Sequence, residues 1–212
     1  MKKVILIPGS FKPFHDGHLS MIESYLKSDF KPDLIRFLIS KKDRDGISAP
    51  VTLKFMKKVL KKFKDVVEVE VCDLPSPITE CYDIIIHSSD TTYTIGGSDK
   101  DDDDRIKVII DAFSKSKGKY YDLVTNNNVK VVKTVIKVES LKYKRRGDEY
   151  KGKDVSASVC RKDIINDDFE KFKTAYINMI KNGYVTEDDV RTYFNQCKKK
   201  CHSLSKDTID KI

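Results

Sequence analysis

The sequence contains no tryptophan and only four histidines, and none of its apolar runs approaches the roughly 18 residues of a membrane-spanning helix. Its first apolar segment, residues 4–7, is also shorter than the roughly 7–15 residues that form the core of a secretion signal. The five cysteines are scattered, and an odd number without regular spacing argues against a disulfide framework. We therefore expect a cytoplasmic protein with reduced thiols and no membrane partner.

The chain is rich in charged residues, and the basic ones are in excess. The 212 residues, 35% of them charged, carry a formal net charge of +8, and the chain is long enough to bury a core. A basic excess suits nucleic acids, but it equally suits small polyanions such as nucleotides. Because basic and acidic residues are interleaved along the chain, we expect a small anionic ligand and do not expect nucleic acid as the main partner.

Strand-like and helix-like segments alternate along most of the chain. The strand-like segments are 4–9, 33–40, 66–71, 91–98 (which ends in a glycine turn) and 129–138; the helix-like segments between them are 18–26, 52–63, 78–87 and 104–113. Such alternation predicts an α/β domain with a Rossmann-like, doubly wound, parallel five-stranded sheet. We expect this domain to span residues 1–166, with a C-terminal helical extension over 167–212.

The stretch GSFKPFHDGH, residues 9–18, follows the first predicted strand. Gly9 permits a turn, and His18 is expected to begin a helix whose free N–H groups attract phosphate. His15 and His18 are three residues apart, so their rings can point the same way, and Lys12 adds a cation. An isolated His-x-x-His pair is more commonly a surface or core pair. No further ligands at zinc spacing accompany this one, so we expect no metal site.

This stretch resembles the G-[ST]-F-x-P-x-H-x-G-H signature of the HxGH nucleotidyltransferases. That superfamily includes nicotinamide-nucleotide and pantetheine-phosphate adenylyltransferases and small cytidylyltransferases, on a Rossmann-like fold. The overall pattern also looks like short nucleotidyltransferase-like proteins encoded by phages. The resemblance implies that Lys12, His15 and His18 are catalytic. It also implies four nucleotide-binding residues in this stretch: Gly9, Ser10, Phe11 and Gly17.

A second stretch, VSASVCRKDI at 155–164, is similar to the family's I-S-[ST]-T-x-[IV]-R motif. Ser156 and Ser158 fall on its hydroxyl positions and would bind nucleotide, while Arg161 falls on the arginine and would be catalytic. The pattern is departed from mildly at three positions: Ala157, Ser158 in place of threonine, and Cys160 in place of an aliphatic residue. A plain helix cap is the alternative interpretation of this stretch taken alone.

Two loops complete the resemblance. Gly97 and Asp99 resemble the turn that contacts base and ribose in the adenylyltransferases, and Lys42 and Arg44 lie where the family places basic groups near the acceptor's phosphate. A charged surface loop explains Lys42 and Arg44 equally well. The acidic run 101–104 is expected to be a solvated helix start, with recruitment of Mg²⁺ as the alternative.

The resemblance implies transfer of a nucleotidyl group from a nucleoside triphosphate to a small phosphorylated acceptor, with Mg²⁺ bound alongside the triphosphate and no organic cofactor. The second motif lacks the R-T-E-G-I-S-T-T run of the cytidylyltransferases, which favours adenylyl transfer, and nicotinamide mononucleotide is the leading acceptor. Cytidylyl transfer, pantetheine-phosphate adenylyl transfer and a non-catalytic nucleotide-binding role stay open, as does a homo-oligomer. The chain lacks the K-M-S-K-S loop of class I aminoacyl-tRNA synthetases, which excludes that class.

Overall fold

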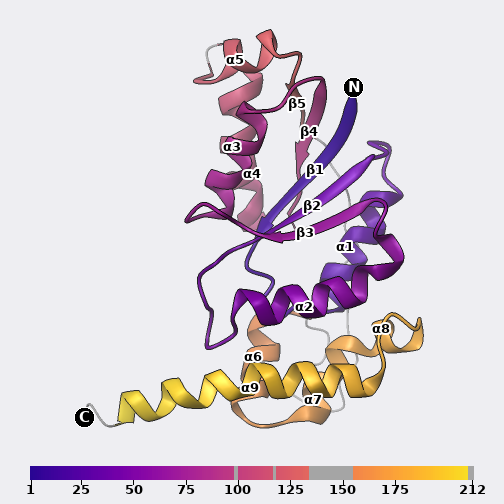
Figure 1. The fold of residues 1–212 in the computed structure, drawn as a ribbon, viewed down its shortest axis with the longest axis vertical. Helices are drawn as coiled ribbons and strands as arrows, with labels where there is room; N and C mark the ends of the chain where they lie inside the picture. Colours follow the sequence, from indigo (N-terminus) through magenta and orange to yellow (C-terminus); the bar gives the residue numbers. More distant parts are fainter. Residues whose placement is uncertain (98–99, 117, 134–154, 210–212) are drawn as a thin grey trace. The chain divides into compact units, whose positions relative to one another are not determined.

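A parallel five-stranded sheet organises the chain (Figure 1). The structure, a computed structural model, describes residues 1–97, 100–116, 118–133 and 155–209. Asp99 and the loop 142–154 lie outside these residues. The strands are β1 (Lys2–Gly9), β2 (Leu34–Ile39), β3 (Val67–Val71), β4 (Thr91–Ile95) and β5 (Lys130–Val131), and their order across the sheet is β3-β2-β1-β4-β5. All neighbours run parallel.

The strand order reverses beside β1. Ile5 is in register with Ile35 of β2 on one side and with Thr94 of β4 on the other. The N–H of Gly96 donates to the carbonyl of Leu6 at 2.8 Å, so the turn after β4 leaves the sheet next to the end of β1. In a sheet of this kind the carboxyl ends of strands at the reversal point are where ligands bind. The predicted Rossmann-like α/β fold is confirmed.

Helices connect the strands and complete the chain. The first five are α1 (Asp16–Leu26), α2 (Ala49–Val59, continued by the 3₁₀ turn η1, Leu60–Phe63), α3 (Pro77–Ile86), α4 (Lys100–Ser114) and α5 (Tyr121–Asn126). The C-terminal part is helical as expected, with α6 (Ala157–Ile165), α7 (Phe169–Lys173), the 3₁₀ turn η3 (Thr174–Tyr176), α8 (Ile177–Lys181) and α9 (Glu187–Ile209). No helix among the described residues has the length and apolar character needed to cross a bilayer.

The sheet is buried on both faces at β1 and β2, which is why these two strands are largely apolar. On one face Val4 and Leu6 pack in a buried cluster with Ile85 of α3 and with Ile109 and Phe113 of α4. Figure 1 shows α3 and α4 on this side of the strands and α1 on the other. The alternate residues of β1 and β2, which face the opposite way, are also fully buried: Ile5, Ile7, Ile35, Phe37 and Ile39.

Several element boundaries differ from the sequence prediction; α2 and α4, for example, begin at Ala49 and Lys100, where 52 and 104 were expected. The strand expected over 129–138 is Lys130–Val131, and residues 134–138 lie outside the described part of the chain. Helix α1 begins at Asp16, two residues before the expected start, because the carbonyl of His15 already accepts the N–H of His18 at 2.9 Å. Helix α5 was not predicted, because six residues are too few to show a helical period.

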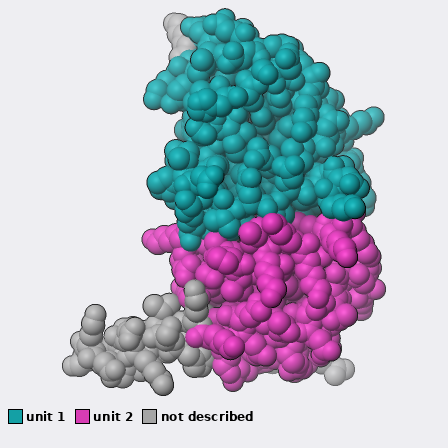
Figure 2. All heavy atoms as spheres, viewed as in Figure 1, with its two compact units in different colours: residues 1–9, 21–41, 63–138 teal, residues 10–20, 42–62, 139–212 magenta. Residues whose placement is uncertain are grey.

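Contacts within the chain define two compact units (Figure 2). Unit 1 contains residues 1–9, 21–41 and 63–138, and unit 2 contains residues 10–20, 42–62 and 139–212. Unit 1 holds the sheet with α3, α4 and α5. Unit 2 holds α2 and α6 to α9 together with the segment that follows β1. A boundary between two domains near residue 166 stays a prediction.

Candidate active site

His15 and His18 cap the start of helix α1 for each other. The Nδ1 atom of His15 accepts the N–H of Gly17 at 3.1 Å, and the Nδ1 atom of His18 reaches back to accept the N–H of His15 at 3.2 Å. This is a reciprocal cap of the kind that Ser and Glu usually provide, made here by two imidazoles. The three-residue spacing of the histidines is therefore the spacing of a helix cap.

The cap also fixes which ring nitrogens carry protons. Because both Nδ1 atoms accept backbone N–H groups, each neutral ring holds its proton on Nε2. The rings of His15 and His18 stack with centroids 3.9 Å apart. Burial lowers the pKa of His18 from 6.5 to about 3. Burial, followed by the neighbouring His18, also holds the pKa of His15 well below its usual value. The pair thus offers two neutral Nε2–H donors.

Two phenylalanines surround the ring of His18. Phe14 stacks on it and Phe11 meets it edge-on, each with ring centroids 5.3 Å apart. Phe11 is buried in spite of a positive φ of 53°, a conformation that costs energy for a bulky residue. These apolar contacts supply the burial that disfavours the charged imidazole. Phe11, which is expected to bind nucleotide, contacts His18 in this structure.

Lys12 is completely buried, which is rare for a lysine. Its Nζ donates to the carbonyl of Lys42 at 2.5 Å, in the loop that follows β2. The side chains of Lys42 and Arg44 themselves are exposed. This contact brings the first motif and the predicted acceptor loop together through the backbone of Lys42.

Arg161 lies on helix α6 and is 9% exposed. Its Nη1 donates to the carbonyl of Lys12 at 2.9 Å, and its Nε lies 2.5 Å from a carboxylate oxygen of Asp45. Asp45 and Gly46 both have positive φ, in a tight turn closed by hydrogen bonds between the backbones of Arg44 and Ile47. That turn directs the carboxylate of Asp45 to the guanidinium.

The serines of the second motif lie at the start of α6. The Ser156 hydroxyl caps the helix by accepting the N–H of Val159 at 3.4 Å, and its Oγ is 2.9 Å from that of Ser158, which is exposed. The first motif is adjacent: a Cβ built on Gly17 would lie 3.7 Å from the carbonyl oxygen of Val155 and only 3.0 Å from the ring of His15. Both motifs therefore meet at Gly17, where a side chain would press on the ring of His15.

A tyrosine fixes the glycine turn after β4 within unit 1. The hydroxyl of Tyr25, on α1, accepts the N–H of Gly97 at 2.8 Å and lies 3.1 Å from the Gly97 carbonyl, to which it donates. A Cβ on Gly96 would come within 2.6 Å of this hydroxyl. Gly9 also belongs to unit 1, where its carbonyl accepts the N–H of Ser40 at 2.9 Å. Ser10, the first residue of unit 2, is partly exposed.

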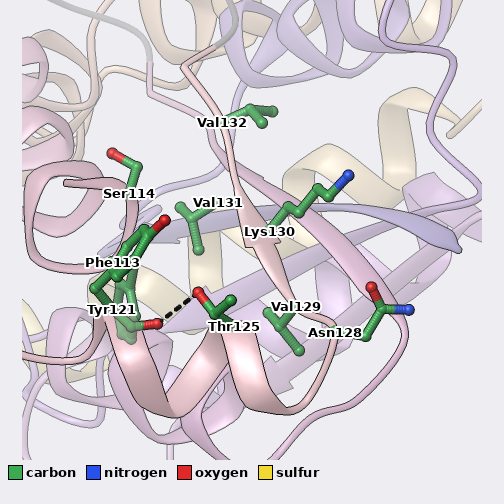
Figure 3. Close-up of a pocket in the computed structure, with 9 residues that line it drawn as sticks. All are labelled: Phe113, Ser114, Tyr121, Thr125, Asn128, Val129, Lys130, Val131 and Val132. Carbon is green, nitrogen blue, oxygen red and sulfur yellow. Dashed lines mark hydrogen bonds between the residues drawn. The ribbon is translucent and has the colours of Figure 1, made fainter. Parts of the chain in front are cut away.

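Unit 1 also contains a cavity of about 310 Å³ between α4, α5 and β5 (Figure 3). Phe113, Tyr121 and Val131 line it, and none of its lining residues belongs to the two motifs or to the predicted acceptor loop. Among the described residues, no three His, Cys, Asp or Glu side chains are grouped as metal ligands.

Two residues near these sites were not predicted from the sequence. Asp45 is one of two acids in the loop 40–47, and only its Asp-Gly turn signal pointed to a fixed position. Tyr25 is 72 residues from Gly97, and its apolar helical spacing suggested a core residue.

The fold and the two adjoining motifs define the class of protein. A parallel sheet has its order reversed beside β1, and the segment after β1 carries two neutral imidazoles and a buried lysine whose carbonyl contacts a buried arginine. Imidazole, ammonium and guanidinium groups are hydrogen-bond donors of the kind that bind phosphate. A profile of the cytidylyltransferase-like family matches residues 6–162. The chain belongs to this family of nucleotidyltransferases.

Comparisons with curated sequences and with solved structures do not narrow the activity further. A search of curated protein sequences finds no significant match. Among solved structures, the chain is similar to a Plasmodium falciparum nicotinic acid mononucleotide adenylyltransferase complexed with NaAD. The alignment has 10% identity and a TM-score of 0.40, and it covers 89% of this chain and 98% of that one. Likeness at this level does not transfer that enzyme's ligand to this chain.

Proposed function

We propose that the protein transfers a nucleotidyl group from a nucleoside triphosphate to a small phosphorylated acceptor and releases pyrophosphate. The observation that supports this most is the reciprocal cap of His15 and His18, because it presents two Nε2–H donors without charging either ring. Family membership over residues 6–162 agrees with it.

The chemistry needs no general base. An acceptor phosphate oxygen, already ionised near pH 7, attacks the α-phosphorus. The bond from that phosphorus to the bridging oxygen breaks, and pyrophosphate leaves with the electron pair. The Nε2–H groups of His15 and His18 donate to the α-phosphate oxygens as negative charge grows there. Donors held in place before the reaction cost no reorganisation, and losing one costs about 10²–10³ in rate.

Lys12 and Arg161 hold the triphosphate in this proposal. A guanidinium forks onto phosphate oxygens, which suits Arg161 to the departing β- and γ-phosphates. Asp45 keeps that guanidinium oriented through its 2.5 Å contact. Mg²⁺ enters as part of the metal–triphosphate substrate and is held by substrate oxygens and water.

We further propose which nucleotide and which acceptor the protein uses. The second motif, with Ser156, Ser158 and Arg161, lacks the longer run of the cytidylyltransferases, which supports adenylyl transfer. Gly97 and Asp99 are assigned to the base and ribose, and Lys42 and Arg44 to the acceptor's phosphate. Nicotinamide mononucleotide is the leading acceptor.

The test is pyrophosphate release from MgATP and MgCTP against a panel of acceptors. The panel contains nicotinamide mononucleotide, phosphopantetheine, glycerol 3-phosphate, phosphocholine and ribose 5-phosphate, with His18→Ala as the control variant. Release that depends on one pair of substrates and is lost in the variant supports the proposal. If calorimetry shows triphosphate binding but no pair gives release, a nucleotide-binding role replaces transfer.

A further inference from the structure

The C-terminal helices hold the histidine-bearing loop through a tyrosine. The backbone N–H of Phe14, directly before His15, donates to the hydroxyl of Tyr193 on α9 at 3.1 Å. Tyr193 is 1% exposed, and burial raises the pKa of its phenol well above the usual value, so the hydroxyl stays neutral and can accept this N–H. The two residues are 179 positions apart in the sequence.

A second anchor lies between the two histidines. The carboxylate of Asp16, which is 1% exposed, accepts the N–H of Asn178 at 2.8 Å and the N–H of Met179 at 3.0 Å, in the first turn of α8. Carboxylates at helix starts are stabilised by the free N–H groups there. Asp16 is the first residue of α1, so this contact fixes the helix start that His15 and His18 cap.

An aromatic cluster surrounds the first of these anchors, Tyr193. The ring of Tyr193 stacks on Phe55 of α2 with centroids 4.0 Å apart and planes 2° apart. Phe172 lies 6.4 Å from Tyr193 and Tyr176 lies 6.3 Å from it, centroid to centroid. Figure 1 shows α9 running alongside α2, and Lys58 of α2 pairs with Asp189 of α9. The hydroxyl of Tyr193 is therefore held in one place.

We propose that the C-terminal helices contribute to the phosphate site by fixing the position of its histidines. In this proposal Tyr193 and Asp16 are positioning residues, which hold His15 and His18 where their Nε2–H groups can donate to the triphosphate. This inference rests on the proposed function. Tyr193 hydrogen-bonds the residue before His15, and Asp16, the residue after it, hydrogen-bonds the start of α8. A shift of this loop would move both Nε2–H donors, although neither Tyr193 nor Asp16 touches the substrate.

The chain supplies a matched control for Tyr193. Tyr176 is fully buried and contacts Phe55 and Phe172, as Tyr193 does. Its hydroxyl makes no hydrogen bond with any residue that the structure describes. The substitutions Tyr193→Phe and Tyr176→Phe therefore remove the same atom from the same cluster, but only the first withdraws the acceptor of the Phe14 N–H.

The experiment measures kcat and KM for the triphosphate in the two variants, and records the ¹⁵N shifts of the imidazole nitrogens at pH 7.5 without substrate. For Tyr193→Phe we expect kcat to fall about 10- to 100-fold, as for a misplacement of about 1 Å, with KM changing much less. We also expect the shifts of both histidines to move. Tyr176→Phe should match the native protein in both readouts.

The inference would be overturned if the two variants had equal kcat and equal histidine shifts. It would also be overturned if Tyr193→Phe only lowered the melting temperature and left both kcat and the histidine shifts at their native values. If Tyr193→Phe does not fold, Asp16→Asn is measured in the same way, and unchanged histidine shifts there would overturn it. If the native protein turns over no substrate pair, the proposed function fails. The histidine shifts still decide whether Tyr193 and Asp16 position the loop.

Discussion

Acidification should destabilise the protein through His15 and His18. An unfolded histidine has a pKa near 6.5, whereas burial lowers the pKa of His18 to about 3 and moves that of His15 in the same direction. Below pH 6.5 the unfolded state therefore binds more protons than the folded state. The stability that the neutral rings contribute is complete above pH 6.5 and falls as the pH drops towards 3.

The size of this effect follows from the shift of His18. Each pH unit between the two pKa values costs about 1.4 kcal/mol, so pH 5 removes at most about 2 kcal/mol through His18. The figure is an upper bound, because His18 as a residue is only partly buried. His15 adds to the loss in the same direction.

Urea unfolding at pH 7.5 and pH 5.0 measures the effect directly. We expect His18→Gln to lose less stability than the native protein between these two pH values. His87→Gln is the control, because it makes the same substitution at a side chain that is 73% exposed and lies outside the two motifs. Parallel loss in the native protein and in His18→Gln would refute the reasoning.

Three further substitutions test other contacts. Gly96→Ala places a Cβ 2.6 Å from the hydroxyl of Tyr25 and should cost about 1–3 kcal/mol in urea unfolding, since the buried ring has little room to move; no loss would show that the turn is loose. Ser156→Ala removes a helix cap and should cost about 0.5–2 kcal/mol by the same assay. Arg161→Lys cannot keep the contacts to both Asp45 and the Lys12 carbonyl, and kcat/KM should fall about 10²–10³-fold; native kinetics would remove Arg161 from the site.

Local patterns predicted most of the fold. The apolar runs at β1 and β2 are visible in the sequence because strands buried on both faces need mostly apolar residues. The alternation of valine and glutamate revealed β3. The helices around the sheet followed from their spacing of apolar residues. Short elements such as α5, and β5 as Lys130–Val131, offer too few residues for a period to appear.

The motifs located the candidate site, but they did not reveal what holds it together. The sequence shows that His15 and His18 are three residues apart, and it does not show that each ring caps a backbone N–H. The contacts of Phe14 with Tyr193 and of Arg161 with Asp45 join residues far apart in the chain. Such pairs carry no local signal, since a tyrosine in an apolar helix face and an acid in a surface loop are both common in protein sequences.

The most direct test of the account follows the imidazole nitrogens of His15 and His18 by ¹⁵N NMR while MgATP, and separately MgCTP, is added at pH 7.5. The account predicts that both rings are neutral with the proton on Nε2. It also predicts that both Nε2–H signals shift and saturate with at least one triphosphate, while the Nδ1 atoms keep their backbone partners. Charged rings, or Nε2–H signals unmoved by either triphosphate, would contradict it.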